Sequence, residues 1–436
     1  MLGWPSPTYP YLLQSDISPI PITLDQTPLI AGFLLEGNCV GALFSTSKLL
    51  SSKMSVCIAF CMQFFGWCVM FGASDIFGLM VSRMTIGFGH SFGTGQLKRY
   101  IKETCEPELA EVLSHYLPLG INVGVIIIYI IGTFVTFRNL AVFSAVIPAI
   151  GVITFGIIPK RLNRTTERRS TIIKNILNNT VILNIADIEK SLTGPEVDEY
   201  KYKQLNIFQC LKETRIRNGL VLILLLVFIQ QYTGATSNII YCQIIFGSVG
   251  NPVPNICGIT YATFFLLATF FSLKFCKDFP RKNNILISCA IIILTTGLMS
   301  LYYYLKHDLI TMSEHFVWAP LFILLLYNAF HTCGISTVPM YIIMEKIPKR
   351  GRNVAVKFQI IHFSISAVIS NKIFQILYVQ YDITISFAFW TVISAFGLIS
   401  VFFFMDDYNP EEEKKKNAHV EKRLSQDISK IEITRL

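Results

Sequence analysis

A run of amide and hydroxyl side chains interrupts an apolar stretch of this sequence, in the segment FIQQYTGATSNIIY from Phe228 to Tyr241. Such groups donate and accept hydrogen bonds without the free-energy cost of burying a charge. On a helix, most of these positions fall, together with one glycine, within an arc of roughly 160°. A polar face of this kind indicates a ligand pathway, although hydrogen bonds between membrane helices are an alternative. The positions on the arc are Gln230, Gln231, Thr233, Gly234, Ser237, Asn238 and Tyr241.

The composition predicts that the elements around this segment are transmembrane helices. Hydrophobic residues make up 52% of the 436 residues and charged residues only 15%. Soluble proteins carry about a quarter charged residues. Runs of roughly 18 or more residues with few charges predict membrane spans. We count eleven, at 28–47, 55–74, 76–97, 112–135, 139–158, 218–246, 258–276, 284–304, 316–343, 353–376 and 384–405.

The distribution of basic residues predicts the orientation. One alternating set of loops holds 33 of the 37 Lys and Arg residues, and the opposite set holds only Arg138 and Lys306. Because Lys and Arg in short loops are retained in the cytoplasm, we expect the 159–217 segment and the C-terminus to be cytoplasmic and residues 1–27 to be outside. The same spread over six loops argues against nucleic-acid binding as the explanation of the net charge of +9.

The chain is organised as two unequal halves. We predict an outer segment (1–27), a first transmembrane half (28–158), a polar linker with short interfacial helices (159–217), a second transmembrane half (218–405) and a cytoplasmic tail (406–436). The halves share a local pattern, YIKETCEPE from Tyr100 and YIIMEKIPKRGR from Tyr341, with 242 residues between Glu103 and Glu345. Parallel repeats with a binding site between them are typical of secondary transporters.

Several motifs resemble the sugar-porter branch of the major facilitator superfamily. They are GWPSPTYPYL with PIPITLDQ, SRMTIGFGHSFG from Ser82 to Gly93, YIKE, QQYTG and EKIPKRGR from Glu345 to Arg352. The opening stretch is most similar to insect trehalose transporters and related glucose and sugar transporters. The resemblance implies an all-α membrane fold with two six-helix halves. Since residues 1–14 contain three prolines and are too short for a span, we expect the first helix to be truncated.

The resemblance also implies roles for individual residues. In the family, the glutamines of the seventh helix bind sugar hydroxyls. The corresponding residues here are Gln230 and Gln231, and Thr236 stands where an asparagine is usual. The expected substrate-binding residues are Gln230, Gln231, Thr233, Thr236, Ser237, Asn238 and Tyr241. Charged residues at the cytoplasmic ends of the helices form a gate. The expected gate residues are Glu103, Arg281, Lys282, Glu345 and Arg352. Because TSKLLSSK replaces an arginine-rich loop in the first half, we expect the gate to be weaker there.

The predicted function is passive sugar transport, in which a hexose or trehalose crosses the plasma membrane by alternating access. A proton-coupled symporter and a non-transporting relative that acts as a sugar sensor or membrane scaffold are the alternatives. The sequence contains no phosphate-binding loop, no HExxH motif and no Cys/His cluster with metal-ligand spacing, so we expect no enzyme activity, cofactor or metal. The expected partners are a sugar and the lipid bilayer; the sequence does not predict an oligomeric state.

Two charges within the first half are expected to pair. Glu36 and Arg83 lie at similar predicted depths, roughly 10 to 13 Å from the outer surface. An unpaired charge within a membrane costs about 2.5 kcal/mol or more, so an ion pair would lower the free energy of both groups. A protonated Glu36, with Arg83 bonded to backbone carbonyls, is the competing interpretation.

Overall fold

The computed structural model describes residues 1–14, 16, 18–47, 49–157, 207–249, 254–276, 279–308, 317–348 and 350–405. Within these residues the regular secondary structure is helical. The first half contains α1 (Pro5–Leu12), η1 (Leu24–Gln26), α2 (Thr27–Phe44), α3 (Ser52–Gly72), α4 (Ile76–Thr104), α5 (Pro107–Phe134) and α6 (Phe137–Ile157). The second half contains α9 (Ile207–Lys212), α10 (Thr214–Tyr232), α11 (Ala235–Ile240), α12 (Cys242–Ser248), α13 (Pro254–Phe275), α14 (Arg281–Asp308), α16 (Ala319–His331), η3 (Thr332–Ser336), α17 (Val338–Lys346), α18 (Arg352–Gln380) and α19 (Ile383–Phe404).

The predicted membrane spans correspond to these helices. In the described part of the chain, ten helical stretches are long and apolar enough to cross a membrane. The eleventh predicted span, 76–97, is α4, which has 29 residues but is less apolar because it contains several Gly, Ser and basic residues. Side-chain caps mark the start of two of these helices: Ser51 caps α3 and Asp75 caps α4. The prediction of an all-helical membrane protein is therefore confirmed.

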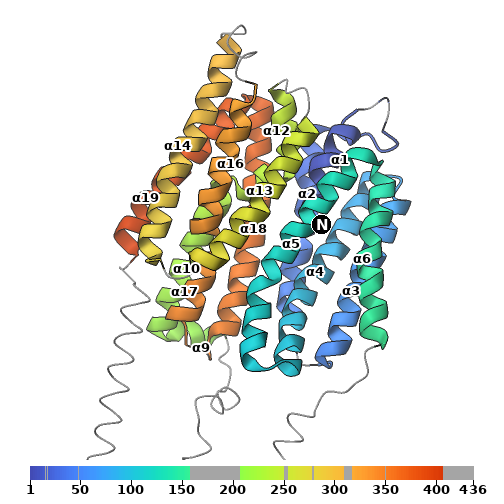
Figure 1. Cartoon of the computed structure of the whole chain (residues 1–436), viewed down its shortest axis with the longest axis vertical. Coiled ribbons are helices and arrows are strands. Elements are labelled where there is room, and N and C mark those ends of the chain that lie inside the picture. The colour runs from blue at the N-terminus through green and yellow to red at the C-terminus, as the bar shows by residue number, and fades with distance from the viewer. Residues whose placement is uncertain are drawn as a thin grey trace, which may run out of the picture.

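The two halves lie side by side as helical bundles. Figure 1 shows the blue-to-teal helices α2 to α6 beside the green-to-red helices α10 to α19. They meet where α2 packs against α18 and where α5 packs against α13. Within the halves, α4 packs against α2 and α3, and α14 packs against α16 and α19. Because α18 also packs against α10 and α11, the interface between the halves passes beside the two helices that carry the polar segment.

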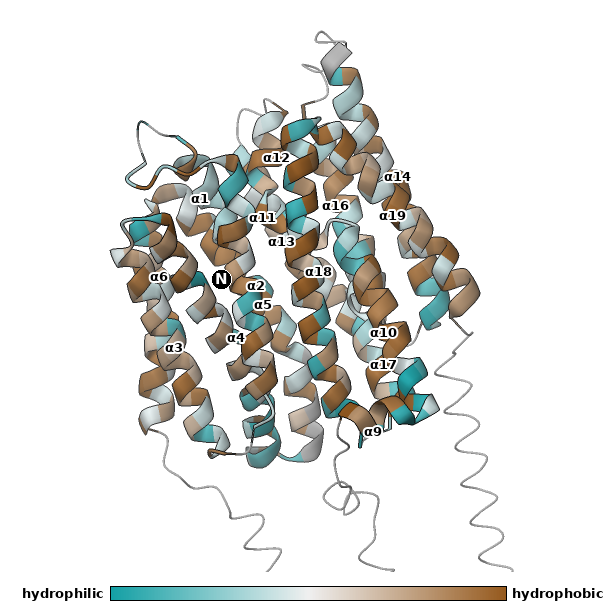
Figure 2. Cartoon of the chain, turned by 180° about the vertical axis from the view of Figure 1, so that it is seen from behind, coloured by the Kyte–Doolittle hydropathy of each residue, from teal (hydrophilic) through white to brown (hydrophobic). Residues whose placement is uncertain are grey.

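Hydrophobic side chains cover the outside of both bundles. Exposed examples are Phe65, Ile147, Phe271 and Phe403, from four different helices. Figure 2 shows hydrophobic positions along most of the helix surfaces and hydrophilic ones near helix ends, around α9 for example. A soluble protein seldom exposes so much contiguous apolar surface, whereas lipid tails accept it.

The two ends of the bundle differ in what they carry. At one end, which we call the α1 end, the short helix α1 lies against α5 and α12, with Trp4, Tyr9 and Leu12 fully buried. Its eight residues are too few to span a membrane. At the opposite end, which we call the basic end, lie α9 and α17 (Figure 1). Residues 159–206 of the predicted linker lie outside the described residues, as does the predicted tail 406–436.

Candidate ligand-binding site and gates

The polar segment that the sequence singles out is a broken helix. α10 ends at Tyr232, α11 begins at Ala235, and Gly234 between them has a φ of 97° in the left-handed region. Only glycine adopts this conformation without strain. A second interruption at Tyr241 separates α11 from α12. The expectation of one continuous helix is therefore wrong here, because the left-handed backbone of Gly234 interrupts the helix.

We expect Gly234→Ala to prevent normal folding of this break. The left-handed conformation costs an alanine about 1–2 kcal/mol, and its Cβ would lie 2.6 Å from ring atoms of Trp390. The yield of monodisperse protein and its melting temperature should therefore both fall. Gly247→Ala is the matched control, since a Cβ at Gly247 meets nothing within 4 Å. A Gly234→Ala variant that melts like the wild type would show that the break is not needed for the fold.

All seven predicted binding residues are buried, but they contact different neighbours. The amide nitrogen of Gln230 donates to Ser336 Oγ on η3 at 3.3 Å. The hydroxyl of Tyr241 lies 3.2 Å from that of Thr27 on α2, in the other half. Thr233 bonds within its own turn, to the carbonyl of Gln230. The exposed fractions are 7% for Gln230, 0% for Gln231, Thr233 and Ser237, 3% for Thr236, and 1% for Asn238 and Tyr241.

A small hydrogen-bond network surrounds Gln231. Its side-chain oxygen accepts from the hydroxyl of Thr236 at 2.6 Å, and its backbone carbonyl accepts from the hydroxyl of Ser370 on α18 at 2.8 Å. The next residue of α18, Asn371, accepts from the hydroxyl of Ser237 at 2.6 Å. The helix break and α18 are thus joined by polar side chains. The Thr236 hydroxyl orients the Gln231 amide through its hydrogen bond.

Four buried amide atoms in this network have no hydrogen-bond partner among the described residues. They are Nε2 of Gln231, Nδ2 of Asn371 and both polar atoms of Asn238. The Tyr327 hydroxyl donates to the Thr233 carbonyl at 3.0 Å and can also accept from the nearby Asn238 amide nitrogen, so Gln231 Nε2, Asn371 Nδ2 and Asn238 Oδ1 are the atoms left for a ligand. Buried polar atoms are nearly always hydrogen-bonded, so a cluster of unpartnered ones requires an explanation. A ligand with several hydroxyl groups would satisfy both donors and acceptors.

Residues from three other elements complete the site. Asn371 comes from α18, Ser336 from η3 and His331 from α16. His331 stacks on Tyr327 with ring centroids 5.4 Å apart, and its Nε2 lies 3.4 Å from the Gln230 carbonyl. η3 is a π-helical turn, a feature that often lies at functional sites. Each of these residues is visible in the sequence as a polar residue within an apolar span. Their proximity to α10 could not be predicted, because no spacing rule relates α16 or α18 to α10.

An aromatic layer covers the network toward the α1 end. Trp390 stacks on Phe374 with ring centroids 5.0 Å apart, and Phe374 lies 5.1 Å from Tyr241. Tyr241 in turn lies 6.1 Å from Tyr9 of α1. Each of these four residues is at most 2% exposed. The layer therefore separates the amide cluster from the α1 end and joins both halves.

A polar chain reinforces this closure between the halves. Gln375 of α18 donates to a carboxylate oxygen of Asp25 in η1 at 2.6 Å, and it accepts from the ammonium group of Lys372 at 2.8 Å. Tyr129 of α5 adds a further link, since its hydroxyl donates to the Ile239 carbonyl of α11 at 2.7 Å. The Gln375 amide thus bridges the ammonium group of Lys372 and the carboxylate of Asp25.

Toward the basic end, Arg281 and Glu345 form a buried ion pair. Nη2 and Nε of Arg281 lie 2.8 and 3.2 Å from Oε1 of Glu345, and the side chains are 3% and 17% exposed. Nη1 donates to the carbonyls of Cys276 and Phe279 at 3.0 and 3.3 Å. The guanidinium also lies 4.3 Å from the ring centre of Tyr341. We call Arg281, Glu345 and these two carbonyls the second-half clasp.

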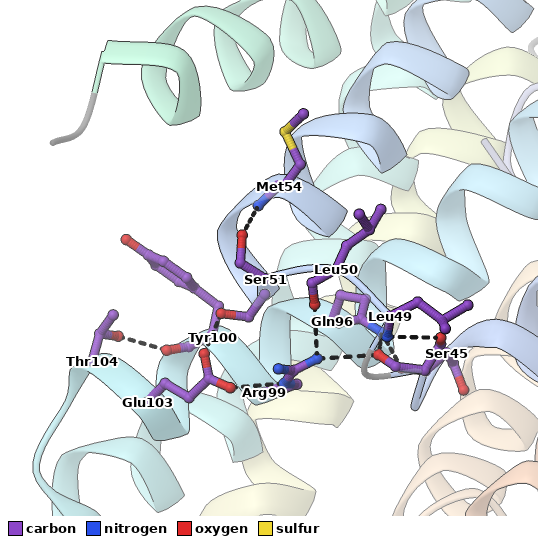
Figure 3. Close-up of polar contacts among 12 residues, drawn as sticks. Ser45, Leu49, Leu50, Ser51, Met54, Gln96, Arg99, Tyr100, Glu103 and Thr104 are labelled. Atoms are coloured by element: carbon purple, nitrogen blue, oxygen red, sulfur yellow. Dashed lines mark hydrogen bonds and ion pairs between the residues drawn. The ribbon is translucent and has the colours of Figure 1, made fainter. Parts of the chain in front are cut away.

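The other predicted gate residues make different contacts. Arg352 donates to the carbonyls of Ile347 and Met344, where α17 ends. The ammonium group of Lys282 lies 5.6 Å from the ring centre of Phe402 on α19. In the first half, Glu103 accepts hydrogen bonds from Ser52 and from Arg99. Figure 3 shows the bond from Arg99. Arg99 was not among the predicted gate residues.

The predicted pair of Glu36 and Arg83 is not present. Arg83 is fully buried, donates to the Met1 carbonyl at 2.8 Å and lies over the ring of Trp4 at 5.3 Å. Glu36 is exposed on α2. Its carboxylate lies near Gly32 one turn earlier on the same helix, on the side where α2 faces Val368 of α18. Equal depth was the wrong criterion, because side chains at the same depth can point to different sides of their helices. Arg83 is bonded to a carbonyl, as the competing interpretation expected.

Comparisons with known proteins decide the family. The family model for sugar (and other) transporters matches residues 15–408. The chain belongs to the sugar transporter family. A facilitated trehalose transporter (Tret1) of Polypedilum vanderplanki is 23% identical over 97% of this chain and 84% of its own length. A Tret1 protein of Bombyx mori is 25% identical over 83% of this chain and 71% of its own length.

Solved structures show the same fold. The inward-open xylose transporter XylE of E. coli superimposes with a TM-score of 0.67 at 13% identity, over 89% of this chain and 88% of XylE. Its partially occluded inward-open form gives 0.66 at 14% identity, over 93% and 96%. The fold is that of the major facilitator superfamily, as the motifs predicted. This sugar transporter family member is an integral membrane protein and not an enzyme.

Proposed function

We propose that this member of the sugar transporter family is a facilitative carrier that moves a hexose or trehalose across the plasma membrane by alternating access. The observation that carries the proposal is the cluster of unpartnered buried amide atoms on Gln231, Asn238 and Asn371. It lies at a helix break, beside the interface of the halves, where transporters of this architecture bind their substrates. The names of the trehalose transporter relatives support the substrate class.

The proposed orientation places the basic end in the cytoplasm, together with the 159–217 linker and the C-terminus. The positive-inside bias of the loops supports it. In this orientation the aromatic layer and the chain from Asp25 to Lys372 close the outer side of the amide cluster. For transport, the halves must separate there and approach each other at the basic end.

Uptake into proteoliposomes tests the proposal. The purified chain should take up radiolabelled glucose or trehalose with saturable kinetics. Vesicles preloaded with unlabelled sugar should show counterflow without an imposed ion gradient. A pH gradient should leave the rate unchanged if the carrier is passive, whereas a proton symporter would respond to it. Folded protein that takes up neither sugar would refute the carrier and leave the sensor or scaffold as the interpretation.

A further inference from the structure

The first half carries a charged cluster at the basic end that resembles the second-half clasp. Nε of Arg99 on α4 lies 2.7 Å from Oε1 of Glu103. Nη1 of Arg99 donates to the carbonyls of Ser47 and Leu50, at 3.1 and 3.3 Å, in the loop between α2 and α3. Figure 3 shows Arg99 between Glu103 on its own helix and this loop. We call Arg99, Glu103 and the two carbonyls the first-half clasp.

The acceptors of the two clasps occupy corresponding positions. The loop carbonyls belong to Ser47 and Leu50 in the first half and to Cys276 and Phe279 in the second, and 229 residues separate the members of each pair. The same interval separates Ser52 from Arg281, which are the first residues of α3 and α14. In both halves one guanidinium therefore bonds a helix-end glutamate and two carbonyls that are three residues apart.

The guanidinium groups, in contrast, do not come from corresponding positions in the two halves. The interval of 242 residues that separates Glu103 from Glu345 also separates Arg99 from Tyr341. In the second half, Arg281 starts α14 and lies over Tyr341. In the first half, Ser52 takes the place of Arg281 and bonds Glu103, while Arg99 takes the place of Tyr341.

We infer that Arg99 replaces the missing loop arginine, so that the first half keeps a complete clasp with its cation moved onto α4. The expectation of a weaker gate in that half stays a prediction, because the Arg99–Glu103 pair is more exposed than the Arg281–Glu345 pair. Arg99 acts as a positioning residue that holds the described residues of the 45–51 loop against α4. Gln96 supports it by donating to the carbonyls of Ser45 and Ser47, at 3.1 and 2.9 Å. Gly95 lets the loop approach, since a Cβ there would lie 2.5 Å from the Ser45 oxygen.

The clasp joins elements that must move together during transport. α2 contacts the opposite half through α18, and the 45–51 loop connects α2 to α3. With the loop bound to α4, the ends of α2, α3 and α4 at the basic end are linked to one another. This consequence for transport rests on the proposed carrier function, whereas the clasp itself does not. The ion pair is partly exposed, at 28% and 39%, so its hydrogen bonds to the loop matter more than its Coulomb energy.

A residue exchange within the chain tests the inference. Arg99→Tyr should raise the amide exchange rate of the 45–52 peptide by about fivefold, the factor expected when a hydrogen bond is lost. It should lower the maximal uptake rate severalfold and leave the KM for sugar unchanged. The double variant Ser52→Arg/Arg99→Tyr copies the second-half arrangement and should restore both values. Lys102→Tyr is the control, because it removes an equal charge from an exposed position on the same helix.

The outcomes separate the clasp from the proposed function. Amide exchange is measured on the purified full chain in detergent and requires no transport. The clasp would be overturned if the 45–52 amides of the double variant exchange as fast as those of Arg99→Tyr. It would also be overturned if Lys102→Tyr raises their exchange rate as much as Arg99→Tyr does. Exchange rates that follow the expected pattern in a protein without uptake would support the clasp and refute the carrier. Should Arg99→Tyr fail to fold, Arg99→Lys keeps the charge without the guanidinium fork and should show the same faster exchange.

Discussion

Gln231→Leu should reduce sugar uptake per folded molecule by about 10- to 100-fold while leaving the amount of folded protein nearly unchanged. The loss of a buried hydrogen-bonding partner costs about 1–3 kcal/mol, and each 1.4 kcal/mol corresponds to roughly a factor of ten in affinity. Nε2 of Gln231 has no partner among the described residues, so a sugar hydroxyl is free to use it. Leucine is well tolerated in a membrane helix.

A matched control separates binding from packing. Gln63 on α3 is also a buried amide, 8% exposed, but it lies outside the amide cluster. Gln63→Leu should therefore leave uptake per folded molecule unchanged. If Gln231 only joins helices, its Leu variant will instead lower the folded yield, and uptake will fall in proportion to that yield. Uptake should be normalised to monodisperse protein, and a normalised value equal to that of the wild type would refute the assignment of Gln231.

The sequence predicts the spans well because a membrane imposes one strong rule. A helix must contain about 20 mostly apolar residues, and its charged residues must lie near its ends. Even α4 could be placed, since all its charges except Arg83 gather in its last turns. The polar stretch from Gln230 to Tyr241 was equally visible, because amides are unusual in an apolar span. These signals are local, so they can be read along the chain.

What the sequence could not predict depends on contacts between helices. The break at Gly234 follows from one backbone angle and from the approach of Trp390, a residue of α19. The expected pair of Glu36 and Arg83 was wrong because the predicted depth contains no information on helix rotation. The role of Arg99 was missed for a related reason, since its partners in the loop are recognised only when the two halves are compared in three dimensions.

Glu345→Gln should destabilise the protein more than the loss of any exposed carboxylate at the basic end. The change leaves the guanidinium of Arg281, only 3% exposed, without a carboxylate. Breaking a buried pair in this way costs on the order of 3 kcal/mol, chiefly because the remaining charge is uncompensated. Glu213→Gln is the matched control. Its pair with Arg350 has the same distance, 2.8 Å, but the side chains are 30% and 46% exposed. An exposed pair contributes about 0–1 kcal/mol, so this control should melt near the wild-type temperature.

The same ion pair should also produce non-additive changes in the free energy of unfolding, which a simple loss of packing would not produce. Because the main penalty of Glu345→Gln is the unpaired Arg281, the double variant Arg281→Gln/Glu345→Gln should be more stable than the sum of the two single changes predicts. We expect a coupling of about 1–3 kcal/mol, measured from chemical or thermal unfolding of all four proteins in detergent. The loop carbonyls of Cys276 and Phe279 lose a donor in both Arg281 variants, so that contribution cancels in the cycle. Additive changes would mean that Arg281 is held by those carbonyls and by Tyr341 alone, and that Glu345 does not stabilise the second-half clasp.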